Sequence, residues 1–154
     1  MKKSCLVTIA ILAFTTFTAF GQNIYPEKLE GCNTEQFGLE NDSIDAHKSN
    51  KFLSELIVKA IEKDVLQELR GILKIQVIAY SDGSSCMISY ENATNKSEKA
   101  INILGIKKLI DKELVWDSVD KVVSPMIEFY FLYDTLKVKR MGFGGKKGWH
   151  EITD

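Results

Sequence analysis

Apolar residues recur every three to four positions in two stretches of this chain, which is the spacing of one face of a helix. The first stretch begins at Asn50, a residue type that caps helices, and extends to Gly71, which can end one. The second follows Asn95 and Glu98, whose spacing is that of a capping box, and runs to Ile110. Two amphipathic helices are therefore predicted. Their apolar positions are Leu53, Leu56, Ile57, Ala60 and Ile61 in the first and Ala100, Ile103, Leu104, Ile106, Leu109 and Ile110 in the second.

Between these helices the apolar spacing changes to two, as in a strand with one buried face. Leu73–Tyr80 and Cys86–Glu91 alternate in this way, and Gly83 in the segment between them can adopt a positive φ. The pattern predicts a β-hairpin. Val77 lies at the middle of its first strand and Leu104 at the middle of the second helix, so we expect both side chains in the core.

A third alternating run starts at Pro125, since the first residue of a strand tolerates a missing N–H. Leu136–Met141 predicts a short fourth strand. The expected fold class is α+β: two helices packed on a three- to four-stranded antiparallel sheet, in helix-strand-strand-helix-strand order. The positions that share one face of the third strand are Ile127, Phe129, Phe131 and Tyr133.

Residues 1–21 have the pattern of a secretory signal peptide. A basic start, Met1–Lys3, precedes an uncharged apolar run over residues 6–20. Ala19–Gly21 then places small residues two apart, as signal peptidase requires. The mature protein is expected to start near Gln22, to be periplasmic or secreted, and to keep no membrane-spanning segment after cleavage.

The rest of the chain divides into three parts by composition. Residues 22–48 are rich in turn formers and acids with little periodicity, which predicts an irregular N-terminal arm. Residues 49–141 hold the periodic segments and form the expected domain. Residues 142–154 are glycine-rich and are expected to form a loose C-terminal tail.

The charge of the mature chain excludes one class of partner. Without Lys2 and Lys3, 18 basic and 21 acidic side chains remain, a net charge of −3. A nucleic-acid-binding domain carries a strong excess of basic residues, so no nucleic-acid partner is expected. The oligomeric state is left open by the sequence.

Two cysteines, Cys32 and Cys86, remain after the leader with Cys5 is removed. In an oxidising compartment they could form a disulfide, which would stabilise the fold by closing a long loop. The alternative is one buried thiol and one loose thiol, because the Cα separation decides the pairing and the sequence does not show it.

Side chains with reactive chemistry form no recognisable catalytic pattern. His47 and His150 are far apart in the sequence, without Cys, Asp or Glu at metal-ligand spacing. Ser84 and Ser85 lie in the hairpin turn without the glycine context of a nucleophile. We therefore expect a non-enzymatic domain that binds no metal or other cofactor.

The order of predicted elements resembles the TonB C-terminal domain family. Gly71–Gly83 has the family's glycine, alternating strand and turn glycine at the same spacing. A second strand at Cys86–Glu91, a helix at Glu98–Ile110, Trp116 and a final apolar strand at Met126–Tyr133 follow in the family's order. The resemblance implies a domain that binds another protein, with the last strand as a sheet edge.

Strand addition is the binding mode that this edge predicts, because an open edge offers N–H and C=O groups to an extended segment. The expected partner is an envelope protein or an extended peptide segment. The rival hypotheses are a small exported enzyme, whose site the sequence does not connect, and a structural envelope protein. The residues expected to bind the partner are Glu128, Tyr130, Leu132, Lys137 and Lys139.

Overall fold

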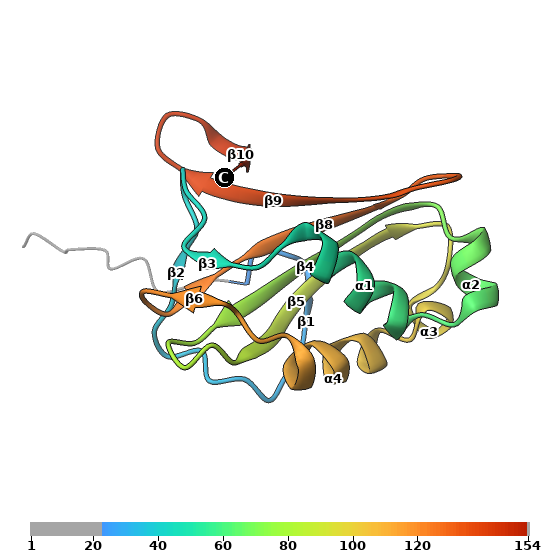
Figure 1. The fold of residues 1–154 in the computed structure, drawn as a ribbon, viewed down its shortest axis with the longest axis horizontal. Coiled ribbons are helices and arrows are strands. Elements are labelled where there is room, and N and C mark those ends of the chain that lie inside the picture. Colours follow the sequence, from blue (N-terminus) through green and yellow to red (C-terminus); the bar gives the residue numbers. More distant parts are fainter. Residues whose placement is uncertain (1–22, 154) are drawn as a thin grey trace, which may run out of the picture.

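The computed structural model describes residues 23–153, and its main feature is a twisted sheet of eight strands with helices along one face (Figure 1). The predicted signal peptide, residues 1–21, lies outside the described residues. The hydrogen-bonded order of the long path is β1-β5-β4-β8-β9-β10, and all its pairs are antiparallel. The strands of this sheet are β1 (Glu27–Lys28), β2 (Gly38–Leu39), β4 (Gly71–Ala79), β5 (Ser85–Thr94), β7 (Val123–Ser124), β8 (Met126–Phe131), β9 (Leu136–Gly144) and β10 (Gly148–Ile152).

The predicted fold class, two helices on a three- to four-stranded antiparallel sheet, is wrong. Strand β2 pairs in parallel with β7, which pairs with β4, and so adds to the sheet beyond the long path. A second, two-stranded sheet joins β3 (Ala46–His47) to β6 (Ser118–Val119). Over residues 23–153 the helical segments are α1 (Asn50–Ala60), α2 (Lys63–Glu68), α3 (Glu98–Ile101) and α4 (Ile103–Glu113).

The N-terminal arm, predicted to be irregular over residues 22–48, contributes β1, β2 and β3. Its strands have two residues each, which is too short for an alternating pattern to predict them. Long-range contacts order them instead. Phe37 is buried in a small apolar cluster with Ile78 and Ile88 of the central hairpin. The arm is thus part of the domain, and a domain limited to residues 49–141 is too short.

The predicted loose tail over residues 142–154 is wrong for residues 142–153, the part that the structure describes. Strand β9 continues to Gly144, and β10 pairs back on it with Ile152 opposite Arg140. Gly145 in the turn between them and Gly148 at the start of β10 have φ values of 59° and 62°, a region that favours glycine. The glycines that suggested disorder therefore build a hairpin turn.

The predicted helices are both interrupted. The first is capped by Ser49, whose hydroxyl accepts a hydrogen bond from the Phe52 N–H at 3.2 Å, and it ends where Ile61 becomes extended. The second breaks at Asn102, which has a φ of 56° and caps α4 by accepting from the Gly105 N–H at 3.1 Å. A Cβ on Gly105 would lie 2.3 Å from the Asn102 amide, which explains the glycine at this position.

The main core lies between the sheet and helices α1 and α4, as the layers of Figure 1 show. Val77 is fully buried in it, as predicted, and Ile106 carries the buried face of α4. Leu104 is 71% exposed, so its predicted place in the core is wrong. The break at Asn102 restarts the helix with a new phase, and Ile103 and Ile106 face the sheet instead.

Candidate functional site

The third predicted strand lies inside the sheet rather than at its edge. Strand β8 pairs with β4 on one side and with β9 on the other, and Glu128 has a partner residue in each. Glu128 is 4% exposed and accepts a hydrogen bond from the Tyr130 hydroxyl at 2.5 Å. Contrary to the sequence-based expectation, Glu128 and Tyr130 do not lie on a strand with a free edge.

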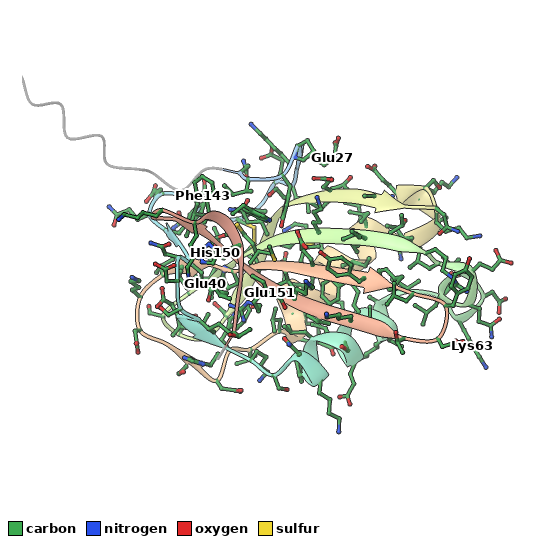
Figure 2. All side chains as sticks on the ribbon, turned by 90° about the horizontal axis from the view of Figure 1, so that it is seen from above. Glu27, Glu40, Lys63, Phe143, His150 and Glu151 are labelled. Carbon is green, nitrogen blue, oxygen red and sulfur yellow. A yellow bond between two sulfur atoms is a disulfide. The ribbon has the colours of Figure 1, made fainter. Side chains whose placement is uncertain are left out.

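An open edge lies one strand further out, along the first half of β9. Strand β10 pairs only with Arg140–Gly144, so within residues 23–153 no strand pairs with the outer side of Leu136–Lys139. In Figure 2, viewed from above, β9 is the outermost of the long strands at this end. Helix α1 lies next to β9 on one face of the sheet (Figure 1), and Val58 of α1 lines the same groove as Leu136 of β9.

Hydrogen-bond alternation fixes which backbone groups face this open edge. Across the β8–β9 turn, the Leu132 N–H donates to the Thr135 carbonyl at 2.9 Å, which makes these two residues a bonded pair. In an antiparallel ladder, bonded and non-bonded pairs alternate. Leu136 and Val138 therefore direct their N–H and C=O groups away from β8. These are the groups that an added strand would bond.

A groove of about 190 Å³ adjoins this edge where the β8–β9 turn meets α1 and α2. Among the side chains that line it, Leu132 is 51% exposed and Tyr133 is 84% exposed. The guanidinium of Arg70 lies 4.8 Å from the centre of the Tyr133 ring, within range of a cation–π interaction. Leu136 belongs to both the groove and the edge. The other apolar residues that line the groove include Val58, Leu66, Leu69 and Phe131.

The five residues predicted to bind a partner separate into two groups. Leu132 lines the groove, while Lys137 and Lys139 lie on β9 beside it. Lys137 is exposed, and Lys139 pairs with Glu151 of β10 at 2.5 Å. Glu128 and Tyr130 remain inside the sheet. Sequence reasoning missed Tyr133 as a site residue because its alternation with Phe131 predicted a shared core face; the strand ends at Phe131 instead.

The face of the sheet opposite the helices carries charges that pair across neighbouring strands. Lys74 on β4 donates to Glu91 on β5 at 3.0 Å. Next to it, the hydrogen bond donated to Glu128 raises the pKa of Tyr130 to about 12, with burial and the Glu128 charge acting in the same direction. These pairings offset the cost of burying polar groups on this face.

The structure joins Cys32 of the arm to Cys86 of β5 in a disulfide, with 5.8 Å between the Cα atoms. This separation is within the range that a disulfide spans. The link fixes the arm to the central hairpin, next to the Phe37 cluster. Lys107 of α4 approaches both sulfur atoms.

Metal-ligating side chains are dispersed over the described part of the chain. Residues 23–153 contain no group of three or more His, Cys, Asp or Glu side chains that could hold a metal ion. His150 lies beside Asp42, with 3.3 Å between Nε2 and Oδ1, while His47 belongs to the small β3–β6 sheet.

No helix among residues 23–153 is both long and apolar enough to cross a membrane. The chain matches no model of a protein family. Comparisons with curated proteins and with solved structures likewise give no significant match.

Proposed function

We propose that this protein is an exported, non-enzymatic domain of the cell envelope that binds an extended segment of another protein by strand addition. The observation that carries the proposal is the open edge at Leu136 and Val138, which is continuous with the groove under the β8–β9 turn. In strand addition, main-chain hydrogen bonds supply affinity and side-chain pockets supply specificity. This edge and groove offer both.

The geometry of β9 defines the segment that fits. Leu136 packs against the core on the helix side of the sheet, whereas Lys137 is exposed and lies opposite Tyr130 on the other side. A residue of the added strand on the helix side would cover Val58, which is 41% exposed. A neighbouring residue on the other side would meet the Lys137 ammonium. An extended segment that alternates apolar and acidic residues is therefore the expected ligand.

Two features of the sequence support the remaining parts of the proposal. Export rests on the leader pattern of residues 1–21. The resemblance to the TonB C-terminal domain family favours protein binding through a terminal sheet edge. N-terminal sequencing of protein recovered outside the cytoplasm tests export, and we expect a start near Gln22. A mature form beginning at Met1 would contradict export.

A proline scan of β9 tests strand addition directly. The probe is a displayed library of eight-residue peptides selected on the mature chain, and the best binders are measured by fluorescence anisotropy. Leu136→Pro deletes an outward N–H without removing a bond to β8, so it should weaken peptide binding about tenfold or more. Leu136→Ala removes the side chain but keeps the donor, and it should weaken binding less.

Circular dichroism of both variants controls for folding. Peptides that bind both variants as tightly as the wild type would place binding elsewhere and contradict the proposal, as would a library that yields no binder. If Leu136→Pro does not fold, hydrogen exchange at the backbone amides of the wild-type protein tests strand addition instead. Addition of a selected peptide should then slow hydrogen exchange at Leu136 and Val138 of the wild type, and unchanged exchange at both would overturn the proposal.

A further inference from the structure

A lysine ammonium lies against the disulfide at the junction of the arm, β5 and α4. The Nζ atom of Lys107 is 3.5 Å from Cys32 Sγ and 3.7 Å from Cys86 Sγ. It is held there by donating to the Met87 carbonyl at 2.9 Å and to Asp111 Oδ2 at 2.7 Å. The other oxygen of Asp111 accepts from the Met87 N–H at 2.7 Å. The ammonium is thus fixed to the same strand that carries Cys86.

This cluster is accessible from solvent. Both cysteines are partly exposed, and the Lys107 side chain is 15% exposed. An open groove of about 390 Å³ borders the cluster on α4, with Lys107, Lys108 and Lys112 against the single carboxylate of Asp111. Reactive cysteines occur in electropositive, partly exposed surroundings of this kind, whereas inert structural cysteines are enclosed.

We propose that Cys32–Cys86 is a redox-active disulfide that exchanges with an external dithiol, and that Lys107 stabilises the thiolate released at Cys86. Exchange is faster when the leaving thiolate is stabilised, and a nearby ammonium stabilises it. Cys86 is fixed in β5, so its contact with Lys107 persists when the bond opens. Cys32 lies in the segment between β1 and β2 rather than on a strand, so it is the cysteine that can carry a mixed disulfide.

The disulfide is reduced in two successive thiol–disulfide exchange steps. A thiolate of the external dithiol attacks Cys32 Sγ; the bond between the two cysteines breaks, and its electron pair leaves on Cys86 Sγ beside Lys107. The second thiolate of the reagent then attacks the reagent sulfur of the mixed disulfide and releases Cys32 as a thiolate. The dithiol is oxidised to a disulfide by two electrons, and its two protons become available to the reduced cysteines.

Other ionisable groups face this site. The Asp111 carboxylate opposes thiolate formation; its Oδ2 accepts from Lys107 and its Oδ1 accepts from the Met87 N–H. Tyr80 packs against the same small apolar cluster as Cys32, and its hydroxyl donates to the Asn33 carbonyl at 2.9 Å. Burial raises the pKa of Tyr80, so this side chain stays neutral where thiols titrate. Of these charged groups, the Lys107 ammonium is the one that contacts both sulfur atoms.

The test measures how fast dithiothreitol reduces the folded protein, with thiols trapped by alkylation and counted by mass spectrometry. Lys107→Gln should slow reduction about three- to tenfold, and Lys107→Arg should restore much of the rate. Lys112→Gln removes a positive charge from the same groove at a position further along α4; it is the matched control and should leave the rate unchanged. Equal rates for Lys107→Gln and the wild type would overturn the proposal.

A second measurement covers the case in which Lys107→Gln loosens the fold and so speeds reduction. In Cys32→Ser, the pH dependence of alkylation gives the pKa of the Cys86 thiol. We expect a value at least about one unit below the ordinary value near 8.5, and a return to that value when Lys107→Gln is added. An ordinary pKa that Lys107→Gln does not change would overturn the proposal, and the disulfide would then be a structural link alone.

Discussion

Arg140 on β9 and Glu40 in the arm form an ion pair that is buried at both ends, with 2% and 0% of the two side chains exposed. The pair joins segments that are 100 residues apart in the sequence. Arg140 also donates to the Ala46 carbonyl at 3.1 Å, while Glu40 accepts from the backbone N–H groups of Asp45 and Ala46 at 3.0 and 3.1 Å. The pair therefore anchors the arm to the outer part of the sheet.

The first prediction concerns this anchor. Glu40→Ala leaves the Arg140 guanidinium buried without its carboxylate, and loss of one partner of a buried pair costs about 3–5 kcal/mol. Urea denaturation should show this decrease in the free energy of unfolding. Lys147→Ala, which removes an exposed partner 3.7 Å from Asp42, should change stability by less than about 1 kcal/mol. A similar small change in both variants would contradict the anchoring role.

The second prediction concerns the close contact between the arm and Gly142 of β9. A Cβ on Gly142 would lie 1.9 Å from the backbone oxygen of Asn41, so the two backbones must separate to admit it. Overpacking of this kind costs about 1–3 kcal/mol, and Gly142→Ala should lower the melting temperature accordingly. Gly38→Ala, where a Cβ meets nothing within 4 Å, is the matched control. Equal melting temperatures would mean that the arm does not lie against β9.

The third prediction separates the buried and exposed apolar positions. Val77 is 0% exposed, and Val77→Asp should unfold the domain because an unpaired buried charge costs several kcal/mol. Leu104 is 71% exposed, so Leu104→Asp should cost less than about 1 kcal/mol. Circular dichroism during thermal denaturation measures both. Equal destabilisation would mean that the phase of α4 differs from the one described.

The central hairpin could be predicted from the sequence because it has a strong local signal. The alternation on either side of Gly83 locates β4 and β5, which pair in the structure with only a bulge between Gln76 and Val77. The phase of the second helix could not be predicted in the same way. It depends on the left-handed conformation of Asn102, and the apolar spacing alone predicts one continuous helix across that break.

The arm and the last hairpin escaped prediction for a different reason. Their structure depends on contacts with residues far away in the sequence, such as the ion pair of Glu40 with Arg140 and the disulfide of Cys32 with Cys86. Neither a two-residue strand nor a glycine-rich turn carries a periodic signal. This omission also misplaced the sheet edge. The number of strands beyond β8 decides which strand is outermost, so Glu128 was assigned to an edge that lies on β9.

The fourth prediction concerns the pH dependence of stability through Tyr130. The hydrogen bond that its hydroxyl donates to Glu128, with burial and the charge of Glu128, raises the pKa of Tyr130 from 10.0 to about 12. The folded protein therefore holds this proton more tightly than the unfolded chain does. The stabilisation is complete below a pH of about 10 and is lost as the pH rises through about 12.

Urea denaturation at a series of pH values between about 9 and 12 measures this loss. Lysines titrate in the same window, so the informative quantity is the difference between the wild type and Tyr130→Phe, which lacks the ionising group. The free energy of unfolding should decrease less steeply with pH in Tyr130→Phe. Glu128→Gln should have a similar effect, because it keeps an acceptor but removes the charge that opposes tyrosinate.

Tyrosinate absorbance of the folded protein should show one group shifting to lower pH in Glu128→Gln. Identical slopes in all three proteins would mean that the Tyr130 hydroxyl does not bond the Glu128 carboxylate in the folded state.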